Sequence, residues 1–144
     1  MKSLVIGYGN DLRSDDGAGR VVADRIEQLG LPSVTVRSVS QLVPELALAI
    51  AETELVVFVD ASIDAVEPTV DPVGPQAANA SAATHYADPA TLLGMTASIG
   101  EVPDRAFVVS IPVSNLDLGF ELSPPTSRAV DLAVELVADL IRSS

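Results

Sequence analysis

Two adjacent carboxylates, Asp15 and Asp16, stand in a glycine-rich segment near the start of the chain. The segment reads Gly-Tyr-Gly-Asn-Asp-Leu-Arg-Ser-Asp-Asp-Gly-Ala-Gly over residues 7–19. It follows the apolar run Leu4–Ile6, which predicts a buried strand, and it precedes a helical pattern. Connections of this kind hold the chemistry of many α/β proteins, and a segment built only for stability would not need two acids side by side. We therefore take this segment as the first candidate for a functional site.

Asp16, Asp60 and His85 together form a candidate metal site. Asp60 ends an apolar run, and His85 is the single histidine of the chain. Two carboxylates and one imidazole suit a divalent ion such as Ni²⁺, Zn²⁺ or Mn²⁺, and three protein ligands leave positions open for a group of the substrate. Other interpretations stay open at this point. Asp16 could serve only as a negative charge that stabilises the N-terminus of a helix. Asp60 could cap a turn, and His85 could be a solvated loop residue.

The elements that would position these residues alternate between strand and helix patterns. Strand patterns cover Leu4–Ile6, Val34–Val39, Leu55–Val59 and Ala106–Ile111, and an edge strand is expected at Thr69–Val73. Helical patterns cover Gly19–Leu29 and Pro44–Ala51. Two further helices are expected, one through Leu92–Ala97 capped by Asp88 or Thr91 and a final one capped by Ser123 or Thr126. The second strand has a polar Arg37, which places it near an edge of the sheet. Residues 76–83 are expected to form a mobile loop.

This alternation predicts an α/β fold, with one domain over residues 1–144. We expect a mostly parallel, twisted sheet of about five strands with helices on both faces. Right-handed crossovers and the strand order 2-1-3 would bring the C-terminal ends of the first and third strands together. Asp15 and Asp16 would then lie beside Asp60 in one crevice.

The composition narrows the classes of function. Twenty acidic residues against eight basic ones give a formal net charge of −12, which disfavours binding to nucleic acid. Cysteine is absent, so no disulfide or thiolate site is possible. No apolar stretch approaches the ~20 residues needed to span a bilayer. We expect a cytoplasmic protein, with no membrane partner, that acts as a monomer.

Five familiar site types fit the sequence less well. Gly7 and Gly9 match the start of a dinucleotide fingerprint, but Leu12 stands where the third glycine belongs. No Gly-Lys-Ser/Thr of a P-loop, no Gly-x-Ser-x-Gly elbow and no His-Glu-x-x-His motif occurs. A phospho-accepting receiver domain shares the acid pair and the acid after the third strand. It also needs a lysine near the last strand, and the only lysine is Lys2.

With these residues in view, the chain resembles the hydrogenase maturation proteases, the endopeptidases that process the large subunits of nickel–iron (NiFe) hydrogenases. Residues 7–19 are similar to the signature Gly-x-Gly-Asn-x-Leu-x-x-Asp-Asp/Glu-Gly-x-Gly of that family. Secondary matches are residues 41–46, the strand ending Val-Val-Phe-Val-Asp-Ala over residues 56–61, and His85 after a variable loop. The likeness covers almost the whole length.

The resemblance implies a three-layer α/β/α fold of the phosphorylase/hydrolase-like kind and an aspartic-type endopeptidase. Asp16, Asp60 and His85 would bind metal, and Asp16 and Asp60 would be catalytic. Asp16 stands where many members carry Glu. The implied substrate is a large-subunit precursor, and the site would recognise the nickel that this precursor carries. Nickel would therefore be supplied by the substrate, and Zn or Cd could substitute for it. Removal of the C-terminal peptide activates the hydrogenase.

Several further roles complete these expectations. Asp15 and Asn10 are expected to shape the loop, with Asp15 bonding backbone N–H groups near the helix start. Gln41 and Glu45 could line the same edge. The alternative from another class is a non-catalytic α/β module that uses the crevice to hold a metal or a partner.

Overall fold

The computed structural model describes residues 2–76 and 88–143. Five strands occur in it, β1 (Ser3–Tyr8), β2 (Val34–Val39), β3 (Leu55–Ser62), β4 (Thr69–Pro72) and β5 (Arg105–Pro112). The helices are the 3₁₀ turn η1 (Ser14–Gly17) and the α-helices α1 (Ala18–Gln28), α2 (Leu46–Ile50), α3 (Pro89–Ile99) and α4 (Pro124–Arg142). None of the described helices is long and apolar enough to cross a membrane.

The five strands form one sheet in the order β2-β1-β3-β5-β4. β1 pairs in parallel with both β2 and β3, β3 pairs in parallel with β5, and β4 alone is antiparallel. This arrangement confirms the expected order 2-1-3 of the first three strands. It also confirms that β2 and β4 are the edge strands. The antiparallel β4 also separates this sheet from the receiver domain, whose sheet is wholly parallel with the order 2-1-3-4-5.

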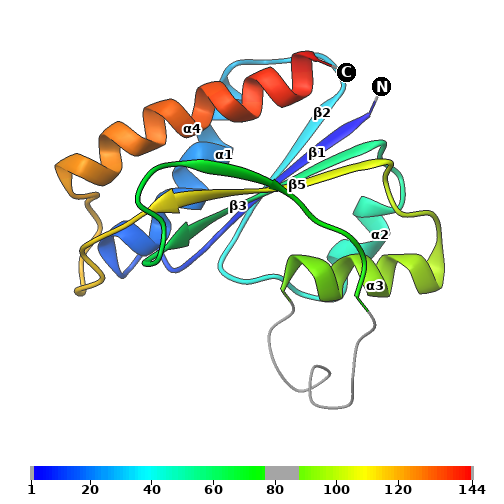
Figure 1. Cartoon of the computed structure of the whole chain (residues 1–144), viewed down its shortest axis with the longest axis horizontal. Coiled ribbons are helices and arrows are strands. Elements are labelled where there is room, and N and C mark those ends of the chain that lie inside the picture. The colour runs from blue at the N-terminus through cyan, green and yellow to red at the C-terminus, as the bar shows by residue number, and fades with distance from the viewer. Residues whose placement is uncertain (1, 77–87, 144) are drawn as a thin grey trace.

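Helices cover both faces of the sheet (Figure 1), as the α/β expectation requires. α1 and α4 pack on one face, where the buried residues include Val5, Val57 and Val137. α2 and α3 pack on the other, with Leu4, Ile6, Phe58, Leu92 and other apolar side chains between them and the sheet. β3 is buried on both faces from Leu55 to Val59, because a central parallel strand lies between two helix layers.

The helix starts agree with the sequence at α3 and differ at α4. The Asp88 carboxylate accepts a hydrogen bond from the Thr91 amide at 2.7 Å, as expected of an N-cap. Ser123 does occupy the N-cap position of α4, but its side chain makes no capping bond there. The hydroxyls of Ser123 and Thr126 donate to Asp15 instead. The predicted N-cap position of Ser123 is therefore confirmed, whereas Thr126 lies inside the helix and no side-chain capping bond is made.

Candidate functional site

The segment between β1 and α1 folds back on the end of β1. The Asn10 side chain accepts a hydrogen bond from the Leu12 amide at 2.9 Å, which closes a tight turn. Gly9 has φ +148°, and a Cβ on it would lie 2.0 Å from the carbonyl oxygen of Asp16, so only glycine fits here. The Asn10 amide then donates to Asp16 Oδ2 at 2.8 Å, which places the Asp16 carboxylate beside the end of β1.

Asp15 is fully buried and serves as an acceptor for the loop between β5 and α4. Its carboxylate receives backbone N–H groups of Ser114, Asn115 and Ser123 at 3.1, 2.9 and 2.6 Å. The hydroxyls of Ser123 and Thr126 donate to it as well, at 2.7 and 2.9 Å. Burial alone would raise the pKa of Asp15, but these bonds outweigh it and lower the pKa to about 2.

Asp15 thus holds the loop, as predicted, but through a different helix from the one expected. The sequence predicts bonds from Asp15 to N–H groups at the start of the helix that follows it. The structure shows it bonding the loop that leads into α4, about a hundred residues further along the chain. The adjacent acids therefore have separate surroundings: Asp15 is enclosed, whereas Asp16 is partly exposed.

Asp60 lies in β3, beside the end of β1. The Tyr8 hydroxyl donates a hydrogen bond to Asp60 Oδ2 at 2.9 Å, while Oδ1 is buried without a hydrogen-bond partner among the described residues. Burial raises the pKa of Asp60, the Tyr8 and Ser110 hydroxyls oppose that rise, and the negative charge of Asp16 adds to it. Burial and the charge of Asp60 likewise raise the pKa of Tyr8, which keeps its proton.

Asp16 and Asp60 open into one cleft of about 240 Å³ at the C-terminal edge of the sheet. Its walls come from the ends of β1 and β3, from η1 and from the segment after β2. The lining residues are Tyr8, Gly9, Asp16, Ser40, Gln41, Leu42, Asp60 and Ala61. The expected meeting of the two acids at the switch between strands is present, and Gln41 lies on the same edge. Glu45 is not part of the cleft wall.

His85, the third predicted ligand, lies outside the described residues. Among the residues that are described, no group of three His, Cys, Asp or Glu side chains is placed to hold a metal. The described part of the site therefore contributes two carboxylates. One of them has a buried oxygen without a hydrogen-bond donor, and a cation would satisfy that atom.

Tyr8 is a side chain of the cleft wall that the sequence motifs do not point to. It lies inside the glycine-rich segment, as the variable residue between two glycines. A signal was available in the strand pattern, because Ile6 pairs with Phe58 and two residues further along each strand are Tyr8 and Asp60. Side chains two positions apart share a face of a sheet, so the phenol and the carboxylate point to the same side.

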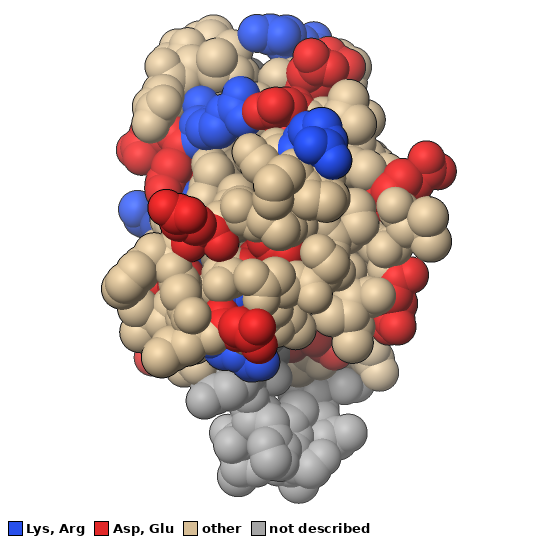
Figure 2. Space-filling view, turned by 90° about the vertical axis from the view of Figure 1, so that its left-hand side faces the viewer, with Lys and Arg blue, Asp and Glu red and all other residues tan. Residues whose placement is uncertain are grey.

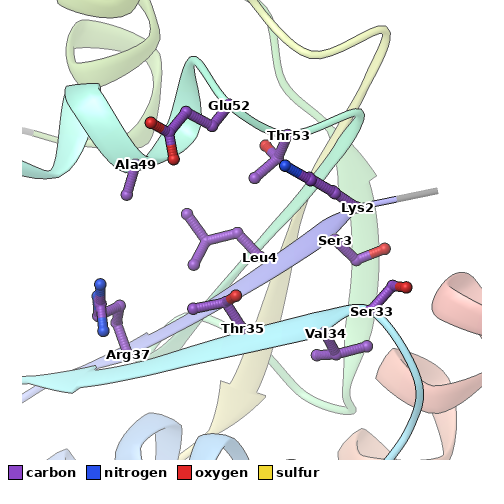
Figure 3. A pocket seen from close by; sticks show the side chains of 10 residues that line it. All are labelled: Lys2, Ser3, Leu4, Ser33, Val34, Thr35, Arg37, Ala49, Glu52 and Thr53. Atoms are coloured by element: carbon purple, nitrogen blue, oxygen red, sulfur yellow. The ribbon is translucent and has the colours of Figure 1, made fainter.

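A larger cleft of about 380 Å³ lies at the opposite end of the sheet (Figure 3). It is lined by the first residues of β1, by β2 and by the residues around the end of α2, with Leu4 at its base and the charged side chains of Lys2, Arg37 and Glu52 around it. It holds one carboxylate and no pair of acids. The ligand-binding edge of an open α/β sheet is the C-terminal one, so the smaller cleft is the candidate site.

Comparison with known proteins gives a fold but no sequence family. No protein-family model matches the chain, and no curated protein matches it. Among solved structures, a hydrogenase maturating endopeptidase from E. coli superposes with a TM-score of 0.76 at 20% identity, covering 99% of this chain and 93% of that one. A NiFe hydrogenase maturation protease from Thermococcus kodakarensis gives 0.76 at 22%, covering 98% and 92%.

A third structure, a hydrogenase 2 maturation peptidase from a Thaumarchaeota archaeon, gives a TM-score of 0.73 at 23% identity and covers 100% of both chains. At this identity the likeness establishes a common fold over nearly the whole length. The expected three-layer α/β architecture is thereby confirmed, and so is the resemblance to this group of structures.

Proposed function

We propose that this chain is an endopeptidase that removes a C-terminal peptide from the nickel-loaded large-subunit precursor of a NiFe hydrogenase. The observation that carries the proposal is the convergence of Asp16 and Asp60 on one cleft, within the fold of structures named as hydrogenase maturation endopeptidases. Two acids brought together from separate strand ends form a site for a cation or for an activated water molecule.

We propose that Asp16 and Asp60 are ligands of the nickel ion that the precursor carries. The two carboxylates interact unfavourably with each other, since the charge of Asp16 raises the pKa of Asp60. A divalent ion between them would relieve that repulsion and satisfy the buried Oδ1 of Asp60. Carboxylate oxygens also bind other borderline ions, so Zn or Cd could substitute for nickel.

His85 is the proposed third ligand. The charge of Asp88 contributes to the raised pKa of Tyr8, which is a residue of the cleft wall. His85 precedes Asp88 by three positions in the sequence, and three Cα–Cα steps span at most about 11 Å. An imidazole beside the two carboxylates would complete a three-ligand set with positions left open for the substrate.

The chain's own residues would orient the reaction in a defined way. Tyr8 holds Asp60 Oδ2 and leaves Oδ1 for the ligand, while the Asn10 amide fixes Asp16 Oδ2. Hydrolysis of the peptide bond near the nickel then needs either polarisation of its carbonyl by the ion or activation of water by one of the carboxylates. Both remain part of the proposal.

We place the reaction in the cytoplasm, where a chain without cysteine needs no disulfide, and assign it to a monomer.

The test compares nickel-loaded with nickel-free precursor and follows the mass of the large subunit. We expect cleavage of the loaded precursor alone, and equal cleavage of both would contradict the nickel-reading role. Asp16→Asn and Asp60→Asn should each lower cleavage by at least about a hundredfold without unfolding the protein. Asp24→Asn, at an exposed position of α1, is the matched control and should cleave normally.

The same assay separates an endopeptidase from a binding module. A module would bind the precursor without changing its mass. Binding with no loss of mass, under conditions in which the nickel is loaded, would therefore overturn the endopeptidase assignment and favour the non-catalytic alternative.

A further inference from the structure

The most exposed large apolar side chains gather on the loops at the C-terminal edge of the sheet. These loops follow β1, β3 and β5 and carry Leu12 (49% exposed), Ile63 (71%), Val66 (94%), Leu118 (88%) and Phe120 (82%). The four most exposed large apolar residues in the described part of the chain are all in this group, which we call the rim. The same edge holds the cleft with Asp16 and Asp60.

Each apolar residue of the rim is next to an acidic residue in the sequence. The neighbours are Asp11, Asp64, Glu67, Asp117 and Glu121, all of them exposed. Asp11 is ion-paired with Arg20 at 3.4 Å. The other four acids form no salt bridge with any residue that the structure describes. Figure 2 looks onto this edge and shows red acidic groups and several blue basic groups separated by tan surface.

The loop that presents Leu118 and Phe120 is held in place by hydrogen bonds. Between these two residues, the Gly119 amide donates to the Leu12 carbonyl at 2.8 Å, and the Gly119 carbonyl accepts from the Ser14 amide at 2.9 Å. The Ser14 hydroxyl also donates to the Asp117 carbonyl at 2.7 Å. These bonds hold the backbone of the loop so that two large apolar side chains are exposed to solvent, which is unfavourable. A surface ordered before binding loses less entropy when a partner covers it.

We propose that the rim is the docking surface for the folded body of the protein whose peptide bond enters the cleft. This inference rests on the proposed endopeptidase function and adds how the substrate is recognised. The docking face of that partner would combine an apolar hollow with surrounding Lys or Arg side chains, because the rim pairs apolar groups with unneutralised acids.

The position of the rim relative to the cleft supports a single partner for both. Ser14, which is bonded to Gly119, precedes Asp16 by two residues, and Ile63 follows Asp60 by three. A protein that delivers a peptide to Asp16 and Asp60 must pass over these loops. The net charge of −12 adds a long-range attraction for a basic docking face.

The first experiment removes the apolar groups of the rim. We expect the double variant Leu118→Ser/Phe120→Ser to raise the KM for nickel-loaded precursor about tenfold or more, with kcat unchanged, because well-packed apolar anchors dominate such interfaces. The matched control is Leu48→Ser/Ile99→Ser, which changes exposed apolar residues of α2 and α3 away from the rim. It should leave KM unchanged.

The second experiment reverses charge and does not depend on apolar truncation. Asp117→Lys/Glu121→Lys should raise KM about tenfold at low salt, and the effect should shrink as salt is added. Glu27→Lys/Glu135→Lys makes the same change of net charge at exposed helix positions and is the control. A rim that acts by its local charge predicts a larger effect for the first pair.

The outcomes separate the two proposals. If the wild type cleaves the precursor while both rim variants retain the wild-type KM, the docking surface is wrong and the endopeptidase function stands. If the wild type neither binds nor cleaves the loaded precursor, both proposals fail. Sedimentation could instead show that the wild type is a dimer and that the variant Leu118→Ser/Phe120→Ser is a monomer. That result would assign the rim to the interface with a second copy of this chain and would overturn the proposal that the substrate docks there.

Discussion

Replacement of Asp15 by asparagine tests the separation of roles between the two adjacent acids. In the wild type, Oδ2 accepts four hydrogen bonds and Oδ1 accepts one, from the Ser123 amide at 2.6 Å. Asparagine keeps one acceptor oxygen and places an NH₂ group at the other position. If the oxygen faces the four donors, the NH₂ group faces the Ser123 N–H, and two donors then oppose each other.

The expected loss of stability has two parts. The pKa of Asp15 is about 2 in the folded chain against a usual value of 3.8. This difference, at about 1.4 kcal/mol per pKa unit, corresponds to about 2 kcal/mol of stability from the charge. A buried donor without an acceptor costs about 1–3 kcal/mol more. We therefore expect Asp15→Asn to lower the free energy of unfolding at neutral pH by about 3–5 kcal/mol.

Denaturant unfolding at several pH values measures both parts. Because the folded pKa is the lower one, the charge stabilises the wild type above about pH 4 and ceases to do so as pH falls through about 2. The difference between wild type and variant should shrink by about 2 kcal/mol across that window. Asp24→Asn is the exposed control and should stay within about 0.5 kcal/mol of the wild type. Equal stability of Asp15→Asn and wild type, or a difference that is constant with pH, would refute the reasoning.

Two further substitutions test the geometry of the site. Tyr8→Phe removes the donor to Asp60 Oδ2. Because a hydrogen bond to a charged group contributes about 1.5–3 kcal/mol, we expect the free energy of unfolding to fall by about that amount and cleavage of the precursor to fall about tenfold. A cleavage rate equal to that of the wild type would exclude a positioning role for the phenol. Gly19→Ala would put a Cβ 2.3 Å from the Val59 carbonyl oxygen, and we expect a loss of about 2 kcal/mol or more in denaturant unfolding. Gly74→Ala, where a Cβ would meet no atom within 4 Å, is its control, and an equal effect of the two would contradict the packing argument.

The glycines of residues 7–19 serve two different structural purposes. Gly9 does serve a turn, but Gly7 and Gly19 are where α1 packs against the sheet, since a Cβ on Gly7 would meet the Gly19 carbonyl oxygen at 2.1 Å. Gly19 therefore permits the close packing of α1 on the sheet.

Much of the fold could be predicted because its strongest patterns are local. The apolar run of β3 and the period of α1 and α4 identify their elements, and the crossover rule then gives the order 2-1-3. The direction of β4 could not be predicted in the same way. β4 pairs with β5, which comes more than thirty residues later, and no pattern within Thr69–Pro72 specifies whether such a distant partner runs parallel or antiparallel.

The site was predictable where the sheet dictates it and not where distant loops do. Asp16 and Asp60 meet because parallel strands end at the same edge, which the sequence order already implies. The partners of Asp15 lie in a loop about a hundred residues away. The pattern around Asp15 points only to the nearest helix, because no local feature of the sequence brings residues 114–123 to the end of β1.

The 3₁₀ turn explains how neighbouring acids can serve opposite purposes. In η1 successive side chains are rotated by about 120°, because a 3₁₀ helix has three residues per turn. Asp15 is thereby directed into the loop before α4, while Asp16 is directed to the cleft beside Asp60. The first acid fixes the turn, and the fixed turn holds the second at the strand ends. Loss of the Asp15 bonds should therefore reduce cleavage as well as stability, although Asp15 itself does not line the cleft.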